Sequence, residues 1–241
     1  MYNSSIIHHT QVKMKKRSIC IILPALDEEL TVGKVIEEIT GQALERNGYQ
    51  VDILVVDGNS SDRTRQIAQE KGARVIIEPR RGKARAVRTA LDEVNADFIF
   101  MLDADYTYPT TYIPDMLKIL EGSPVVIGSR LKGKREKGAM RRLNLIGNHL
   151  LTWLANTLYR TKVSDLCTGY WGFRGEVIRN ISLIFEGFQL EAELLTQFAK
   201  KGYAVAEIPI HYRRREGKAK LSGLKDGIKI GWMLLYWRFR A

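Results

Sequence analysis

Two aspartates separated by one alanine follow an unbroken apolar run, because residues 98–102 lead directly into Asp103, Ala104 and Asp105. Such a run is typical of a buried parallel strand. Its polar end then lies at the carboxyl edge of a sheet, where open α/β folds bind their ligands. Mg²⁺ binds through one or two carboxylates and substrate phosphates. The pattern therefore favours metal-assisted chemistry on a nucleotide over two solvated loop acids.

Polar, turn-forming residues follow two earlier apolar runs. Residues 19–23 lead into Pro24, and residues 51–56 lead into Asp57 and a loop rich in Gly, Asn and Ser. A carboxylate at a strand end can accept hydrogen bonds from a base or ribose, and the free N–H groups of a following helix can meet polar ligand atoms. An ordinary capped strand–helix turn accounts for each segment equally well when it is taken alone.

Helix signals accompany these strand ends. We expect Asp27 to cap a helix that carries Glu28 and Glu29 in its first turn, where the helix dipole favours acids. Ser61 or Asp62 is expected to cap the next helix.

The chain must place these residues with alternating strands and helices, which is typical of a parallel sheet with helical crossovers. Strands are predicted at residues 19–23, 51–56, 74–77, 98–102, 125–127, 170–174 and 204–210, and helices at 63–71, 83–94, 115–120, 143–159, 191–201 and 224–240. A loop rich in Gly, Lys and Arg is predicted at 128–142. The fold class is therefore α/β.

The charge of the chain restricts its partners. Its 241 residues include 38 Lys and Arg against 27 Asp and Glu, a net charge of +11. This excess favours nucleic acid, anionic lipid surfaces or phosphorylated substrates. Residues 1–17 lack the apolar segment of a secretory signal, and residues 230–237 are too few to span a membrane. Cys20 and Cys167 lie far apart, and Cys20 sits in an apolar strand pattern that favours a core thiol over a disulfide or a metal ligand.

Eight segments, in order, resemble the family-2 glycosyltransferases of GT-A fold. They read PALDEE, VVDGNSSDRT, RRGKARAVRTAL, FIFMLDAD, VVIGSR, SDLCTGYWGFR, FQLEAELL and EIPIHYRRREGKAKL. The later ones are similar to the polyprenyl-phosphate glycosyltransferases, which include dolichol-phosphate mannose synthase. The resemblance implies a Rossmann-like, mostly parallel sheet flanked by helices. We expect a flexible leader (1–17), a GT-A domain (18–223, with a nucleotide-sugar half at 18–130 and an acceptor half at 131–223) and an amphipathic C-terminal helix (224–241).

The resemblance also assigns roles. Asp103 and Asp105 should hold Mg²⁺ or Mn²⁺ and, through it, the donor diphosphate. Arg130, and Arg214 or Arg215, should face phosphate groups; the family spacing leaves open which of the last two does so. The remaining expected donor and cofactor contacts are Pro24, Leu26, Glu28, Asp57 near the base, Lys83, Ala104 and Lys220.

Three positions depart from the family pattern. Gly58 stands where many relatives have a second acid that contacts the base, so the sequence leaves GDP and UDP donors open. Thr107 stands where relatives often have Gln, so water is a possible third metal ligand. Ala219, in the stretch Gly-Lys-Ala-Lys that ends at Lys220, replaces a family serine and removes one hydroxyl donor.

The basic segments indicate a phosphate acceptor. A lipid monophosphate is already a dianion near neutral pH because its second pKa is about 6, so it needs positive charge and no protein base. Residues 132–142 and 213–215 supply that charge. A hydroxyl acceptor would need a base, for which Glu191 and Glu193 are the candidates. Either glutamate could instead be structural, and Asp165 could order its own segment.

We therefore expect an inverting, metal-dependent transferase that moves a sugar from a nucleoside diphosphate to a polyprenyl or dolichyl phosphate, with no nucleic-acid partner. The aromatic and basic residues of 224–240 are typical of an interfacial helix, which suggests peripheral attachment to the cytoplasmic membrane face; a helix packed back on the domain is the alternative. An oligomer is possible. The rival functions are the same fold acting on a soluble hydroxyl acceptor and a non-catalytic basic protein that binds RNA or membranes.

Overall fold

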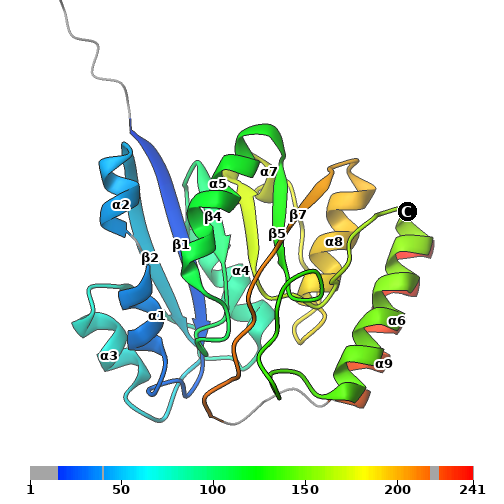
Figure 1. The fold of residues 1–241 in the computed structure, drawn as a ribbon, viewed down its shortest axis with the longest axis horizontal. Coiled ribbons are helices and arrows are strands. Elements are labelled where there is room, and N and C mark those ends of the chain that lie inside the picture. The colour runs from blue at the N-terminus through cyan, green and yellow to red at the C-terminus, as the bar shows by residue number, and fades with distance from the viewer. Residues whose placement is uncertain (1–15, 40, 218–222, 241) are drawn as a thin grey trace, which may run out of the picture.

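The computed structural model describes residues 16–39, 41–217 and 223–240. A sheet of seven strands forms its centre in the order β3-β2-β1-β4-β6-β5-β7 (Figure 1). The strands are β1 (Arg17–Ala25), β2 (Tyr49–Asp57), β3 (Arg74–Ile77), β4 (Phe98–Met101), β5 (Val125–Ser129), β6 (Trp171–Arg174) and β7 (Val205–Pro209). β6 runs antiparallel to its neighbours β4 and β5, and the other pairs are parallel. The predicted mostly parallel α/β sheet is confirmed.

Helices cover both faces of the sheet. They are α1 (Val32–Glu38), α2 (Gly41–Arg46), α3 (Thr64–Glu70), α4 (Lys83–Glu93), η1 (Thr110–Tyr112), α5 (Ile113–Gly122), α6 (Arg142–Tyr159), α7 (Gly175–Ile178), α8 (Leu190–Lys200) and α9 (Gly223–Phe239). Apolar residues of α1, α2, α3 and α5 pack on one face, and those of α4, α6, α7, α8 and α9 pack on the other.

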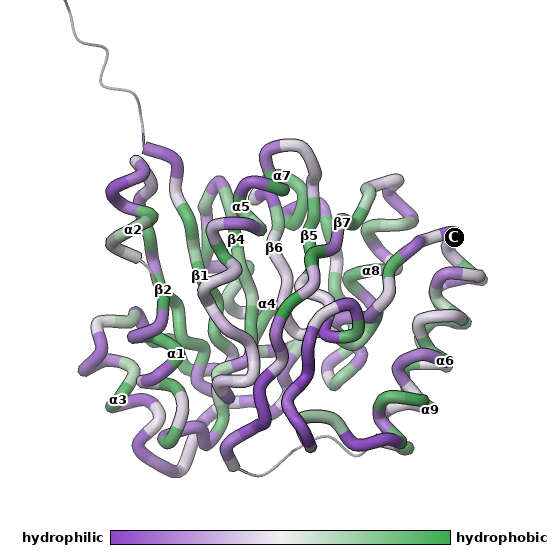
Figure 2. Tube along the Cα trace, in the orientation of Figure 1, coloured by the Kyte–Doolittle hydropathy of each residue, from purple (hydrophilic) through white to green (hydrophobic). Residues whose placement is uncertain are grey.

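The alternation of side chains along β1 feeds both cores. Cys20 and Ile22 belong to the cluster beneath α4 and α8, whereas Ile19, Ile21 and Leu23 belong to the cluster beneath α1 and α5. A strand buried on both faces reads as a continuous apolar run, because successive side chains point to opposite sides. Figure 2 shows hydrophobic strands in the interior of the molecule and largely hydrophilic loops at the lower edge of the sheet.

The predicted start of a helix at Asp27 is wrong. α1 begins at Val32 and has no acid in its first turn. Asp27 has a left-handed backbone with φ of 47°, and its Oδ1 accepts hydrogen bonds from the Ser61 N–H at 2.8 Å and the Ser61 hydroxyl at 3.1 Å. Asp27 therefore joins two loops. The sequence signal was misleading because an aspartate can cap a helix or bond to a neighbouring loop equally well.

α6 and α9 lie beside each other on one flank of the sheet (Figure 1). α9 buries Ile230, Met233 and Leu234 in the core, so this helix does pack against the domain, through α6 and α8. No helix in the described part of the chain is long and apolar enough to cross a membrane. Both cysteines are free, and Cys20 is buried, as predicted for a core thiol.

Candidate active site

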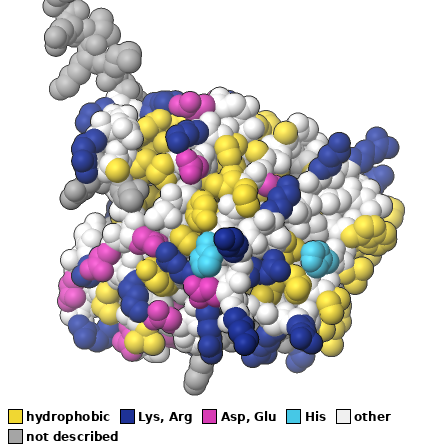
Figure 3. Space-filling model, in the orientation of Figure 1, with side chains coloured by type: hydrophobic (Ala, Val, Ile, Leu, Met, Phe, Trp, Pro, Cys, Tyr) yellow, Lys and Arg dark blue, Asp and Glu magenta, His cyan; other side chains and the backbone are white. Residues whose placement is uncertain are grey.

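The predicted site residues gather at the carboxyl edge of the sheet, at the bottom of Figure 1. All strands except β6 end there because they run in one direction. The antiparallel β6 starts at this edge, so the preceding segment 165–170 lies there too. Figure 3 shows Lys and Arg side chains gathered along this edge, interspersed with acids.

Asp103 lies against a buried lysine. Its Oδ1 is 2.5 Å from Nζ of Lys83, the first residue of α4, and the same Nζ is 2.6 Å from Oε1 of Glu191 in the first turn of α8. Burial acts to lower the pKa of Lys83, but the two carboxylates outweigh it and hold that pKa above its ordinary value. Lys83 is therefore charged and bridges two acids.

Gly169 makes this approach possible. A Cβ on residue 169 would lie 2.7 Å from Oδ2 of Asp103 and 3.1 Å from Nζ of Lys83. Any side chain there would displace the aspartate or the lysine. Nothing in the local sequence marks this glycine, because only the fold reveals that the segment before β6 passes the end of β4.

Asp105 is almost fully buried and receives three kinds of donor. The Thr107 N–H and hydroxyl donate to its Oδ1 at 3.1 and 2.6 Å, and Arg215 Nη1 lies 2.5 Å from its Oδ2. Arg215 Nη2 also lies 2.5 Å from Oε1 of Glu28, which follows β1. Burial and the nearby charge of Asp103 raise the pKa of Asp105 against the opposing effects of Arg215 and Thr107. Thr107, which lacks the family amide, positions this carboxylate.

The loops after β1 and β2 are joined by reciprocal hydrogen bonds. Besides the contacts of Asp27, the Glu28 N–H donates to Oγ1 of Thr64 at 2.7 Å, and the Glu29 N–H donates to Oδ2 of Asp62 at 3.1 Å. Asp62 also accepts the N–H of Thr64 at 2.9 Å at the start of α3. The N-cap position of α3 is Arg63, without a side-chain cap, so the predicted cap at Ser61 or Asp62 is wrong. The two expected nucleotide-contacting loops therefore form one unit.

Asp57 is at the end of β2 but is not open to solvent. Arg65 of α3 donates to its Oδ2 through Nη2 at 2.6 Å and Nε at 3.1 Å, and the carboxylate is fully buried. Pro24 and Leu26 are half-buried nearby, and the N–H of Gly58 donates to the carbonyl of Ala25 at 2.8 Å. Asp57 therefore orders the loop, and its contact with a base stays a prediction.

Arg130 is buried in an ion pair. Its backbone N–H and Nε each donate to Oδ2 of Asp165 at 2.9 Å, and its Nη2 donates to Oδ1 at 2.8 Å. Asn148 of α6 donates to the same Oδ1 at 2.6 Å. The structure thus turns this guanidinium toward Asp165, in contrast to the expected phosphate-facing arginine. Burial raises the pKa of Asp165, but Arg130 outweighs it and holds that pKa below its ordinary value.

The three consecutive arginines after β7 have different surroundings. Arg213 pairs with Glu38 and lies 4.3 Å over the ring of Tyr106. Arg215 binds the two acids described above, whereas the side chain of Arg214 is exposed and makes no ion pair among the described residues. Lys220 falls outside the described residues.

The two candidate bases are also engaged. Glu191 binds Lys83, and the fully buried carboxylate of Glu193 accepts the N–H groups of Ile184 and Phe185 at 2.9 and 3.2 Å. Burial raises the pKa of Glu193. Glu193 therefore holds the segment before α8, and only Glu191 lies beside the paired aspartates.

The donor set at the end of β4 fits a hard divalent cation. The described residues contain no cluster of three or more His, Cys, Asp or Glu side chains suited to a metal, so the protein ligands there would be Asp103 and Asp105. Mg²⁺ and similar ions bind with one or two carboxylates when water and substrate phosphates complete the shell. Such a donor set suits an ion that arrives with a phosphorylated ligand.

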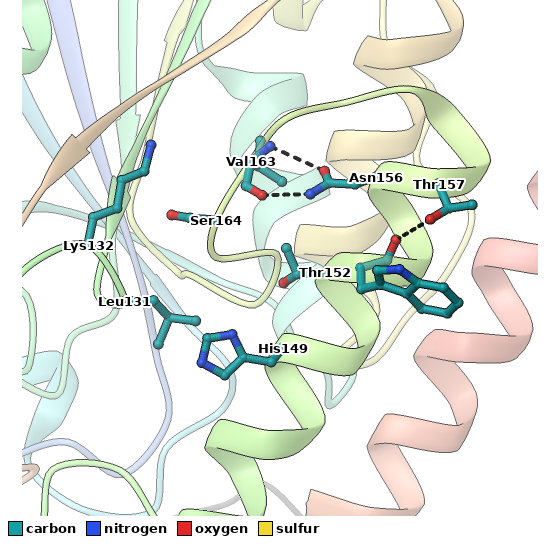
Figure 4. Close-up of a pocket in the computed structure, with 9 residues that line it drawn as sticks. Leu131, Lys132, His149, Thr152, Asn156, Thr157, Val163 and Ser164 are labelled. Atoms are coloured by element: carbon teal, nitrogen blue, oxygen red, sulfur yellow. Dashed lines mark hydrogen bonds between the residues drawn. The ribbon is translucent and has the colours of Figure 1, made fainter.

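A separate pocket of about 540 Å³ lies between α6 and the segment after β5 (Figure 4). Leu131 lies beside His149 in Figure 4, Lys132 pairs with Glu207 at 2.7 Å, and Asn156 of α6 donates to the carbonyl of Val163 at 2.8 Å. Its other lining residues are Thr152, Trp153, Thr157 and Ser164. None of the paired acids lines this pocket.

A mostly parallel sheet with paired acids and clustered arginines at its carboxyl edge defines an α/β protein. The model of the family "Glycosyl transferase family 2" matches residues 20–182, more than half of the chain. The chain belongs to this family and is a glycosyltransferase. Family membership removes the non-catalytic binding protein from the alternatives.

Three curated relatives illustrate the family. The chain is 36% identical over 216 residues to dolichyl-phosphate hexose transferase of Haloferax volcanii, covering 88% of this chain and 90% of the relative. It is 34% identical over 214 residues to glycosyltransferase AglJ of the same organism, covering 87% and 68%. It is 28% identical over 215 residues to dolichol-phosphate mannosyltransferase of Pyrococcus furiosus, covering 85% of this chain but only 59% of that protein.

Solved structures confirm the GT-A fold. Glucosyl-3-phosphoglycerate synthase of Mycobacterium tuberculosis, in complex with phosphoglyceric acid, superposes with a TM-score of 0.71 at 23% identity, covering 92% of this chain and 80% of that one. The same enzyme in complex with Mn²⁺, UDP and glucosyl-3-phosphoglycerate gives a TM-score of 0.68 at 23% identity, covering 92% and 78%.

Proposed function

We propose that this glycosyltransferase moves a sugar from a nucleoside-diphosphate sugar to a polyprenyl or dolichyl phosphate, with inversion and with a divalent cation. The observation that carries the proposal is the meeting of Asp103 and Asp105 with basic side chains from α4 and the segment after β7. The names of two relatives, a dolichyl-phosphate hexose transferase and a dolichol-phosphate mannosyltransferase, support the acceptor. A solved enzyme of similar fold, bound to Mn²⁺ and UDP, supports the donor class.

The proposed roles divide along the sheet edge. Asp103 and Asp105, joined by Ala104, hold Mg²⁺ or Mn²⁺, which supplies Lewis-acid stabilisation of the leaving diphosphate. The joined loops that carry Pro24, Leu26 and Glu28 form the wall of the nucleotide pocket in the half 18–130. Because Asp57 already accepts from Arg65, we propose that it orders this wall.

The acceptor half, 131–223, supplies positive charge. Arg214 is exposed and makes no ion pair among the described residues, so we propose that it contacts phosphate, together with Lys220. The buried Arg130 positions the segment that carries Asp165. A phosphate acceptor is a dianion near neutral pH and attacks without a protein base, which agrees with Glu191 and Glu193 both being engaged.

An exposed apolar face supports contact with a membrane surface. Figure 3 shows hydrophobic side chains along the edge where α6 and α9 lie. The exposed large residues recur every three or four positions and are Leu143, Ile146, Leu150 and Trp153 on α6, and Leu224, Ile228, Trp232, Leu235 and Phe239 on α9. Such spacing places each set on one side of its helix. Basic residues at Arg141, Arg142, Lys225, Lys229 and Arg238 accompany them.

Apolar residues beside Lys and Arg are the composition of a helix that lies in an anionic membrane interface. We propose that α6 and α9 together rest peripherally on the cytoplasmic face of a membrane, where a polyprenyl phosphate is presented. This attachment would supply the acceptor at the sheet edge and explain why two long helices carry exposed apolar stripes.

The test is a transfer assay followed by extraction. Purified protein is incubated with Mn²⁺, labelled GDP- and UDP-sugars in turn, and vesicles that contain polyprenyl phosphate. We expect label in the organic phase with one donor, and none with Asp105→Ala. Label that stays in the aqueous phase on a soluble acceptor would overturn the lipid acceptor. It would favour the rival supported by the soluble-acceptor neighbour, a glucosyl-3-phosphoglycerate synthase.

A further inference from the structure

Each of the two expected metal-binding aspartates shares a cationic side chain with a second acid. Lys83 lies 2.5 Å from Asp103 and 2.6 Å from Glu191. Arg215 lies 2.5 Å from Asp105 and 2.5 Å from Glu28. Both cations are therefore held between an inner acid, which belongs to the proposed metal site, and an outer acid, which does not.

A divalent cation and these side chains compete for the same oxygens. Mg²⁺ binds carboxylate oxygen at about 2.0–2.1 Å, so an ion on Asp103 or Asp105 would lie next to the ammonium of Lys83 or the guanidinium of Arg215. Like charges at that separation repel strongly in a partly buried site. Metal binding therefore requires both cations to withdraw from the inner acids.

The charge balance permits this exchange. Four carboxylates face two cations, which leaves a formal charge of −2 for the cluster, calculated as −4 from the acids and +2 from Lys83 and Arg215. A divalent ion would neutralise the cluster if both cations stayed on their outer acids. Arg215 is suited to a new acceptor, because its buried Nε has no hydrogen-bond partner in the described structure.

We propose that Lys83 and Arg215 are exchangeable counterions, which occupy Asp103 and Asp105 without metal and withdraw to Glu191 and Glu28 when the divalent ion binds. Glu191 and Glu28 are positioning residues that retain the two cations beside the site. There the cations face the diphosphate that the ion brings. This inference rests on the proposed function for the identity of the ion and its ligand.

The exchange predicts opposite effects for two substitutions. Lys83→Met removes the competing cation, so Mn²⁺ should bind roughly tenfold more tightly or better, as expected for losing a unit charge a few ångströms from a divalent ion. Glu191→Gln removes the alternative partner of Lys83, so the lysine stays on Asp103 and Mn²⁺ should bind about three- to tenfold more weakly. A purely structural Lys83 would give weaker binding in both variants.

The experiment measures free Mn²⁺ by electron paramagnetic resonance during titration of the full chain without donor. Lys71→Met is the control, because it removes the same charge from an exposed pair with Glu37, and its affinity should stay within twofold of wild type. An unchanged or weaker affinity in Lys83→Met overturns the exchange, as does absence of Mn²⁺ binding in both wild type and this variant. Thermal unfolding verifies each fold.

If Lys83→Met does not fold, Glu191→Gln and Arg215→Met decide, with weaker and tighter Mn²⁺ binding expected respectively; any other pair of results overturns the proposal. Metal affinities that shift as expected without sugar transfer would refute the proposed function and leave the exchange intact. Sugar transfer with unshifted Mn²⁺ affinities would refute the exchange and leave the proposed function intact.

Discussion

Neutralising Asp165 should destabilise the fold more than neutralising an exposed charged residue. The reason is that the buried Arg130 would lose its charged partner. Asp165 is fully buried and Arg130 is 8% exposed. The carboxylate accepts three hydrogen bonds from Arg130 at 2.8–2.9 Å and one from Asn148 at 2.6 Å. Removing one partner of a buried pair typically costs about 3–5 kcal/mol, because the other charge is left uncompensated.

The assay is thermal and urea unfolding of wild type and Asp165→Asn, which keeps the side-chain shape. For a chain of this size, each 1 kcal/mol shifts the melting temperature by about 2–4 °C, so a drop of roughly 6–20 °C is expected. The control is Asp115→Asn on α5, which breaks an exposed pair with Lys118 and should change the free energy of unfolding by less than about 0.5 kcal/mol.

The pH dependence provides a second check. The pKa of Asp165 lies below its ordinary value in the folded protein, mainly because Arg130 overcomes the effect of burial. A lowered folded pKa stabilises the protein above the unfolded pKa, about 3.9, and this stabilisation is lost as pH falls through the folded pKa. The difference between wild type and Asp165→Asn should therefore be full at pH 7 and shrink below about pH 4. A difference under about 1 kcal/mol at pH 7 would refute the reasoning.

Three further predictions concern the site and the helical face. Asp105→Asn should lower sugar transfer at least about 100-fold in protein that thermal unfolding shows to be folded, measured with labelled donor; retention of a tenth of the activity would contradict its metal role. Gly169→Ala places a methyl group 2.7 Å from Asp103, so Mn²⁺ affinity should fall, whereas Gly147→Ala, with open space around it in α6, should leave that affinity unchanged and stabilise the helix by about 0.5–1 kcal/mol. Ile228→Ser should reduce sedimentation with anionic vesicles, and the equally polar change Ile77→Ser, at an exposed residue of β3, should not; equal sedimentation of both variants would exclude α9 from the contact.

Much of the fold could be predicted because each strand and helix has a recognisable hydrophobic pattern in its own local sequence. The predicted strand 74–77 coincides with β3, and most other predicted strands and helices differ from the observed ones by only one or two residues at each end. The antiparallel direction of β6 could not be predicted in this way, because a short apolar strand has the same sequence pattern in either orientation. That orientation has a consequence for the site, since it brings Gly169 against Asp103.

The sequence could indicate which residues come together at the edge of the sheet, but not which acid pairs with which base. Asp103, Asp105, Lys83 and Arg215 were all named from the sequence, and the structure brings them to one edge. The sequence could not show that Arg130 would turn inward to Asp165, 35 residues away. An arginine beside a strand end satisfies either a ligand or a buried acid, and the choice depends on which acid the fold delivers.

The sequence by itself determined the α/β class, the family and the two aspartates at the end of a buried strand, because periodicity and motif spacing are local properties of the chain. Only the tertiary structure decided which cation lies on which acid. The Asp103–Glu191 bridge through Lys83 and the Asp105–Glu28 bridge through Arg215 join residues from five separate segments. Ion pairs form between charged groups that lie a few ångströms apart in space, and the separation of two residues along the chain does not determine that distance.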